Sequence, residues 1–253
     1  MISVPFINLA AQPSALQSEL RAVVNRVLAS GQYVLGENVA AFERETARFT
    51  GAKFAVGVAS GSDALLLSLQ ALGIGASDST STRPPEVITT PFTFIATAEA
   101  IRRVGAKIVF ADIDAADFNI NPQQIERRMT RNTRAVLPVH LFGQPSAMDA
   151  ILALAGKRKL VVVEDAAQAM GAKFRGRCVG TFGHAGTLSF YPTKNLGAAG
   201  DAGMVLTNSK SVADRIRILR VHGARYRYQH QHHGINSRRR RDHGNGGTVP
   251  QHC

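Results

Sequence analysis

The sequence predicts an α/β fold in which helices cover both faces of an open, mostly parallel sheet. Short β-branched runs alternate with stretches of helical periodicity along most of the chain. The apolar runs are nearly continuous, as expected for parallel strands that are buried on both faces. With 253 residues, of which 45% are hydrophobic and 19% charged, the chain can enclose a packed core and is not disordered as a whole.

The elements follow one another in a regular order. Two amphipathic helices are predicted first, at about 14–29 and 37–49. Strands are predicted from the β-branched runs at 54–59, 86–90, 107–112, 134–140, 159–164, 185–190 and 203–207. Helices are expected at 63–72, about 96–103, from Asn121-Pro122 onward, near 147–155 and at about 211–221. Pro122 suits a first helical position, and Ser209 or Ser211 can cap the last helix.

The net charge of +12 suggests an anionic partner, but its distribution argues against a nucleic-acid-binding protein. Residues 1–208 hold 20 Lys and Arg against 16 Asp and Glu, whereas residues 209–253 hold 10 against 2. The basic character therefore belongs to the C-terminal segment, and no specific nucleic acid is expected. Two cysteines, no membrane-length apolar run and no signal-like N-terminus favour a cytoplasmic protein without a membrane partner.

A turn between the first strand and its helix has the composition of a phosphate site. Ala59-Ser-Gly-Ser-Asp-Ala64 contains Gly61 and Ser62, whose small size lets the backbone approach a ligand. The free N–H groups and the dipole at a helix start favour a phosphate there. The alternative is an ordinary helix cap at Ser62 or Asp63.

Four further residues lie at or shortly after the ends of predicted strands. Asp165 could pair with a cationic ring nitrogen, bind a metal or cap the next helix, and Gln168 could contact the same ligand. Lys194 precedes a glycine-rich loop and is placed for a Schiff base, although a solvated loop lysine is the alternative. Phe94 could stack on a planar cofactor or pack in the core. The loop lacks the residue order of a P-loop, and no metal site is predicted.

Taken together, these residues indicate pyridoxal 5'-phosphate more specifically than any one of them does. Phosphate, planar ring, ring nitrogen and aldehyde would each receive one partner at a strand–helix junction. Asp165 would keep the ring nitrogen protonated, and Lys194 would bond the aldehyde and then move protons.

The sequence resembles the DegT/StrS-type sugar aminotransferases, which have the fold type I large domain of aspartate aminotransferase. The resemblance runs from Pro5 to about Arg238 and rests on motifs in the family's order: Ser30-Gly-Gln-Tyr-Val-Leu-Gly36, Ala59-Ser-Gly-Ser-Asp-Ala-Leu65, Pro91-Phe-Thr-Phe-Ile-Ala-Thr97, Pro138-Val-His-Leu-Phe-Gly-Gln144, Glu164-Asp-Ala-Ala-Gln168, Ser189-Phe-Tyr-Pro-Thr-Lys-Asn195 and Gly234-Ile-Asn-Ser-Arg238. It implies that Ser189 adds a hydroxyl to the phosphate site and that Asn236 reaches the cofactor phosphate of a neighbouring subunit.

The resemblance implies a homodimer with shared active sites that moves an amino group from glutamate to a nucleotide-linked keto sugar, for surface-polysaccharide or amino-sugar synthesis. Because Lys194 is present, amino transfer is favoured over the sugar dehydration of a branch with histidine there. The motifs give way at 237–238 to a basic, aperiodic segment. We therefore expect a cofactor domain at 1–238, a disordered out-of-family tail at 239–253 from a frameshift, and a largely missing small domain. A truncated non-catalytic product or a cofactor-binding sensory relative is the alternative.

Overall fold

The computed structural model describes residues 7–75, 83–226 and 229–230. Asn236 and the expected tail at 239–253 lie outside the described residues. The helices are α1 (Ser14–Ser30), α2 (Glu37–Thr50), α3 (Gly61–Ala71), α4 (Ile95–Arg103), α5 (Pro122–Arg128), α6 (Met148–Arg158) and α7 (Lys210–Leu219), with 3-10 turns at Leu9–Ala11 (η1) and Leu141–Gly143 (η2).

The strands are β1 (Phe54–Val58), β2 (Glu86–Thr89), β3 (Lys107–Phe110), β4 (Thr133–Val136), β5 (Val161–Asp165), β6 (Lys173–Phe174), β7 (Arg177–Cys178), β8 (Ala185–Ser189), β9 (Gly203–Thr207), β10 (Ala224–Tyr226) and β11 (Gln229–His230). Sequence reasoning missed the two short hairpins β6–β7 and β10–β11. Their two- and three-residue strands are too short to leave a period-2 pattern.

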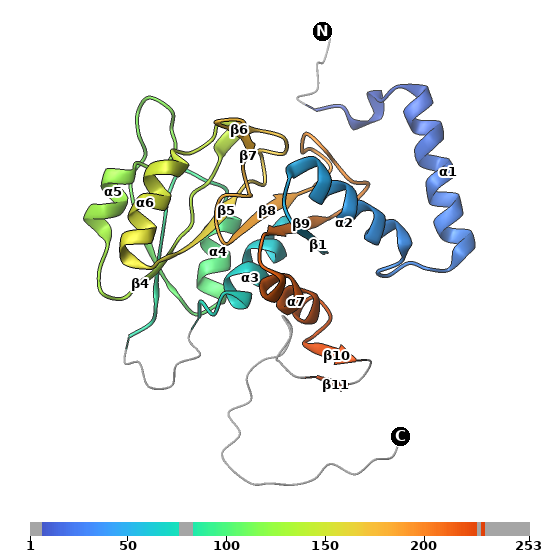
Figure 1. Ribbon diagram of the computed structural model, residues 1–253. Coiled ribbons are helices and arrows are strands. Elements are labelled where there is room, and N and C mark those ends of the chain that lie inside the picture. The colour runs from blue at the N-terminus through green and yellow to red at the C-terminus, as the bar shows by residue number, and fades with distance from the viewer. Residues whose placement is uncertain (1–6, 76–82, 227–228, 231–253) are drawn as a thin grey trace.

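A seven-stranded sheet in the order β1-β9-β8-β5-β4-β2-β3 confirms the predicted α/β fold (Figure 1). Neighbouring strands from β8 to β3 pair in parallel. β9 is antiparallel to both of its neighbours and pairs residue for residue with β1, from Phe54 opposite Thr207 to Val58 opposite Gly203. The carboxyl ends of β1, β2, β4, β5 and β8 therefore meet at one edge of the sheet.

Helices cover both faces of this sheet. Leu66 and Leu69 of α3 pack with Ile101 of α4 over the β2–β4–β5 region, and α3 and α7 share a second cluster over β1 and β9. On the other face, α5 and α6 pack around Met148 and Ile151. Along β2 and β9 every residue is buried, which explains their continuous apolar runs.

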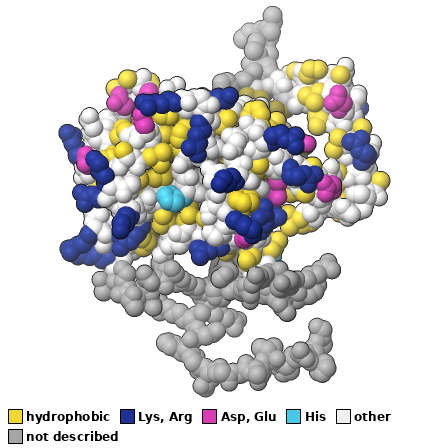
Figure 2. All heavy atoms as spheres, in the orientation of Figure 1, with side chains coloured by type: hydrophobic (Ala, Val, Ile, Leu, Met, Phe, Trp, Pro, Cys, Tyr) yellow, Lys and Arg dark blue, Asp and Glu magenta, His cyan; other side chains and the backbone are white. Residues whose placement is uncertain are grey.

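The first helix, α1, lies apart from the sheet in Figure 1. None of its side chains is buried among the residues that the structure describes. Several of its apolar side chains, among them Leu20, Val24 and Leu28, are more than two-fifths exposed, and Figure 2 shows hydrophobic atoms on the surface of this helix. In the described part of the chain, no helix is both long enough and apolar enough to cross a bilayer.

A buried carboxylate fastens the end of β5. Glu164 is fully buried, and its two oxygens accept the backbone N–H groups of Gly180, Phe182 and Gly183 at 2.6–2.7 Å. It also contacts Nε2 of His140 at 3.0 Å. Because Nδ1 of His140 accepts the N–H of Ser146, the ring proton lies on Nε2 and is donated to Glu164. Glu164 thus ties the turn at 180–183 and the loop that carries His140 to the strand that ends at Asp165.

Glu164→Ala is expected to lower the free energy of unfolding by about 3 kcal/mol or more, because it leaves several buried donors without an acceptor. Urea denaturation measures this loss. Glu37→Ala is the control, since Glu37 makes an exposed pair with Arg44, and it should cost less than about 1 kcal/mol. Equal losses in the two variants would contradict the role assigned to Glu164.

Candidate functional site

A pocket of about 460 Å³ opens at the edge of the sheet where the parallel strands end. Open α/β sheets bind their ligands at this edge. Its lining comes from the segments after β1, β2, β4, β5 and β8 and from the segment before β9: Ser60, Gly61, Ser62, Leu65, Thr93, Phe94, Ala96, Thr97, Val139, Leu141, Asp165, Ala167, Gln168, Ser189, Tyr191, Thr193, Lys194, Asp201 and Ala202.

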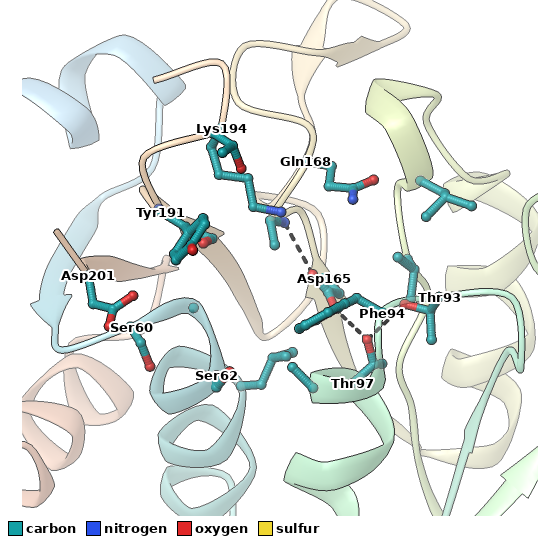
Figure 3. Close-up of a pocket in the computed structure, with 18 of the residues that line it drawn as sticks. Ser60, Ser62, Thr93, Phe94, Thr97, Asp165, Gln168, Tyr191, Lys194 and Asp201 are labelled. Atoms are coloured by element: carbon teal, nitrogen blue, oxygen red, sulfur yellow. Dashed lines mark hydrogen bonds between the residues drawn. The ribbon is translucent and has the colours of Figure 1, made fainter. Parts of the chain in front are cut away.

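The pocket brings together the predicted site residues that the structure describes, many of which Figure 3 shows around one space. They are Gly61, Ser62, Phe94, Asp165, Gln168, Ser189 and Lys194. The remaining predicted residue, Asn236, lies outside the described part of the chain. Residues up to 133 positions apart in sequence therefore converge on one site, as the strand order dictates.

The start of α3, here called the cradle, lines the pocket with Gly61 and Ser62, and its cap differs from the one expected. Ser60, in extended conformation, caps the helix by accepting the N–H of Asp63 at 3.1 Å. The alternative capping residues Ser62 and Asp63 instead lie inside the first turn, so that assignment was wrong. Ser60 uses the N–H of Asp63. The N–H groups of the first residues of α3, Gly61 and Ser62, can therefore donate to a ligand in the pocket.

Glycines allow close approaches around this cradle. A Cβ on Gly61 would lie 2.7 Å from Cβ of Ser189, and a Cβ on Gly203 would lie 2.2 Å from the carbonyl oxygen of Ser60. Both positions require glycine for steric reasons. The helix start, the end of β8 and the beginning of β9 are thereby packed into one small-residue surface.

Asp165 is a buried acid at the end of β5, with 5% of its surface exposed. Its Oδ2 accepts the hydroxyl of Thr97 at 2.8 Å, and its Oδ1 accepts the N–H of Ala167 at 3.1 Å. Burial raises the pKa of Asp165, and these two hydrogen bonds together with the nearby His140 and Lys194 oppose that rise. The helix-cap alternative is wrong, because the next helix, α7, begins at Lys210 and is capped by Ser209. The described residues contain no metal-binding cluster.

Lys194 lies in the loop after β8, where its backbone N–H binds the carbonyl of Tyr191 at 2.8 Å. Its side chain is half-buried, and in Figure 3 it extends from that loop toward the side of the pocket where Asp165 lies. Lys194 is the single lysine among the described residues that line the pocket. Lys194 is therefore placed to react with an electrophile bound in the same pocket as Asp165.

Gln168 lines the pocket and is anchored to a neighbouring turn. Its Oε1 accepts the backbone N–H of Phe142 at 2.9 Å. Phe142 has a left-handed backbone (φ 53°) inside η2 and is 79% exposed. One acceptor position of the Gln168 amide oxygen is thus used by the protein, and its amide nitrogen can donate to a ligand.

Phe94 was expected either to stack on a ligand or to pack in the core. It is 68% exposed, immediately before α4, and its ring lies at the pocket in Figure 3. The core alternative is therefore wrong. A large exposed aromatic side chain beside a pocket is suited to cover a flat ligand.

Sequence reasoning missed six polar residues of the lining, namely Ser60, Thr93, Thr97, Tyr191, Thr193 and Asp201. Thr93 and Thr97 stand in the same motif as Phe94. Their four-residue spacing puts them on one face at the start of a helix, a signal that was available. Tyr191 and Asp201 lie in loops, whose path sequence periodicity does not predict.

Comparison with known proteins identifies a family whose model matches most of the chain. Residues 14–240 match the model of the DegT/DnrJ/EryC1/StrS aminotransferase family. The chain is 48% identical over 237 residues to a "pleiotropic regulatory protein" of Geobacillus stearothermophilus, covering 94% of this chain and 62% of that protein. It is 44% identical to a UDP-N-acetyl-3-dehydro-α-D-glucosamine 3-aminotransferase of Acidithiobacillus ferrooxidans, covering 93% and 62%.

Among solved structures, NtdA of Bacillus subtilis with bound cofactor PMP superimposes with a TM-score of 0.83 at 29% identity. That match covers 91% of this chain and 52% of the solved chain. The chain spans about six-tenths of the length of the curated relatives it matches.

Proposed function

The chain belongs to the DegT/DnrJ/EryC1/StrS aminotransferase family, and from that premise we propose that it binds pyridoxal 5'-phosphate and transfers an amino group from glutamate to a nucleotide-linked keto sugar. The single observation that carries the proposal is the convergence of a helix-start cradle, a buried acid and a lysine on one pocket. The bound PMP of NtdA supports the same cofactor.

The residues present fit this cofactor. The small-residue surface around Gly61, which a Cβ would fill, suits a phosphate at the start of α3. The cofactor supplies an aldehyde that condenses with amines and a cationic ring that withdraws electrons from the bonded carbon. Asp165, buried and acidic, is suited to face a cationic ring nitrogen, and Phe94 and Gln168 are suited to contact the ring.

The pocket residues would divide the work of holding this cofactor. Gly61, Ser62 and Ser189 would hold its phosphate through backbone N–H groups and hydroxyls. The Asp165 carboxylate would hold the proton of the ring nitrogen, and the Lys194 amine would bond the aldehyde and serve as the acid and base that carries a proton. Burial of the Asp165 carboxylate strengthens its attraction for a cation, because the surrounding dielectric is low.

The substrate class rests on relatives. The Acidithiobacillus ferrooxidans protein is named for a 3-keto UDP-sugar, which supports a nucleotide-linked keto sugar and a role in amino-sugar or surface-polysaccharide synthesis. Glutamate as amino donor, a homodimer in which Asn236 reaches a neighbouring phosphate, and a cofactor domain at 1–238 belong to the same proposal. Cys178 is a buried free thiol, in keeping with a reducing, cytoplasmic location.

A second candidate function is cofactor binding without turnover. The regulatory name of the 48% identical Geobacillus protein favours it. The two candidates share the pocket and differ only in whether an amino group reaches a sugar.

Two measurements on the 253-residue chain test the proposal. Titration with pyridoxal phosphate should produce a visible absorbance band that borohydride removes, and Lys157→Ala, an exposed lysine on α6, should behave like the wild type. Glutamate with a nucleotide-linked keto sugar should then yield an amino sugar detectable by mass. Absorbance without amino sugar would favour the second candidate, whereas no absorbance change would contradict both.

A further inference from the structure

Two threonine hydroxyls at the start of α4 form a hydrogen-bonded chain that ends on Asp165 (Figure 3). Thr97 donates to Oδ2 of Asp165 at 2.8 Å, and the hydroxyl oxygens of Thr93 and Thr97 are 2.9 Å apart. An ionised carboxylate only accepts hydrogen bonds, so the single hydroxyl proton of Thr97 is used there. Thr93 must then donate to Thr97, which gives the chain one direction, toward Asp165.

The chain is held rigidly at its inner end. Thr97 is completely buried in the first turn of α4, and its backbone N–H binds the carbonyl of Phe94 at 3.2 Å. A β-branched side chain in a helix has few rotamers, so the hydroxyl is pre-oriented. The same turn therefore places the exposed Phe94 at the pocket and the buried Thr97 against Asp165.

Few groups balance the cost of a charge at Asp165. Burial raises its pKa, while the Thr97 hydroxyl, the Ala167 N–H and the Lys194 ammonium favour the charged form. His140 also favours the charged form of Asp165, but its two ring nitrogens are already engaged by Ser146 and Glu164. Once bonded to a cofactor aldehyde, Lys194 would no longer be an ammonium, whereas the Thr97 hydroxyl would stay in place.

We propose that Thr97, held by Thr93, is a positioning residue that fixes the Asp165 carboxylate as an anion at the floor of the pocket. The inference rests on the proposed function, because the anion serves to hold a cationic cofactor ring. Thr97 acts through Asp165, because its single hydroxyl proton is donated to that carboxylate. A threonine that only packs would affect the stability of the fold, whereas Thr97 also stabilises the negative charge of Asp165.

Thr97→Val, which keeps the shape and removes the hydroxyl, is the decisive variant. In the cofactor-free chain, carbon NMR of the Asp165 carboxyl should show a higher pKa than in the wild type, because the charged form has lost a donor. Affinity for pyridoxal phosphate at neutral pH should fall about tenfold or more, the value of one hydrogen bond to a charged group. Thr97→Ser restores the donor and should recover both quantities.

Thr89→Val is the matched control. Thr89 is equally buried on β2, and its hydroxyl donates to the carbonyl of Leu137 at 2.8 Å, away from Asp165. It should destabilise the fold comparably and leave the Asp165 pKa and the cofactor affinity unchanged. Unchanged values in T97V, or equal changes in T89V, would overturn the proposal.

Thr93→Val is the second variant and should change both quantities in the same direction as T97V by a smaller factor. Were T97V unfolded, T93V would decide the matter, and wild-type values in it would overturn the proposal. The NMR measurement needs no cofactor. A wild-type chain that binds no pyridoxal phosphate would therefore refute the proposed function while leaving the effect of Thr97 on Asp165 measurable.

Discussion

Replacing Lys194 by alanine should abolish the covalent attachment of pyridoxal phosphate and reduce amino transfer at least about a thousandfold. The reason is that Lys194 is the single lysine among the described residues that line the pocket. Without it, the chain lacks both the amine that bonds the cofactor and the group that moves the proton, and each task is worth orders of magnitude in rate.

Mass spectrometry after borohydride reduction measures this directly. The wild type should carry the cofactor on the peptide that contains Lys194, and K194A should carry none, while it still binds the cofactor reversibly through the phosphate site. Lys157→Ala, an exposed lysine near the end of α6, should label like the wild type. If mass spectrometry found the cofactor attached to another lysine of the wild-type chain, the role assigned to Lys194 would be wrong.

Asp165→Asn should have two opposite effects, one on function and one on stability. Amino transfer should fall about a hundredfold or more, because a preorganised charge at the reacting group is replaced by a neutral amide. The cofactor-free chain should become more stable at neutral pH, because the wild type holds a carboxylate in a site that disfavours its charge.

The pH dependence has a definite sign. Burial raises the pKa of Asp165 in the folded chain above the ordinary aspartate value of 3.8. Below 3.8 the carboxyl is neutral in both states and costs nothing. As pH rises from there through the folded pKa, the unfolded chain ionises first, so the wild type loses stability. The Asn variant lacks this loss, and the difference between the two unfolding free energies should grow over that range and then level off.

The asparagine can be accommodated without broken hydrogen bonds. Its oxygen can accept the N–H of Ala167, and its amide nitrogen can donate to Thr97, whose hydroxyl then turns toward Thr93. Urea denaturation at a series of pH values measures the effect. Asp149→Asn, in an exposed pair with Arg175, is the control and should change stability little. A variant D165N that is less stable than the wild type at neutral pH would contradict the argument.

Much of the fold was predictable because it depends on local patterns. The continuous apolar runs that became β2 and β9 predicted strands buried on both faces, and they are buried throughout. Asn121 and Pro122 marked the start of α5, where the Asn121 side chain caps the helix. Ser209, one of two proposed caps for α7, is the one that the structure uses.

The remaining features depend on contacts between distant residues. The three backbone donors that surround Glu164 come from a turn 16–19 residues away, and no periodicity indicates them. The antiparallel direction of β9 follows from the path of the chain before it, and its apolar run is the same in either direction. The cap at Ser60 was misplaced because a run of Ser, Gly, Ser and Asp offers several caps of similar strength.

The position of β9 in the sheet also determines which part of the fold forms late during synthesis. β1 pairs with β9 across about 150 residues, and β9 supplies Gly203, which packs against Ser60 at the start of α3. On a ribosome, β1 and α3 emerge long before their partner strand is made, and contacts this distant in sequence form slowly. The phosphate cradle would thus be the last part of the sheet edge to close. A nascent chain stalled before residue 203 would hold the Asp165 side of the pocket without the cradle beside it.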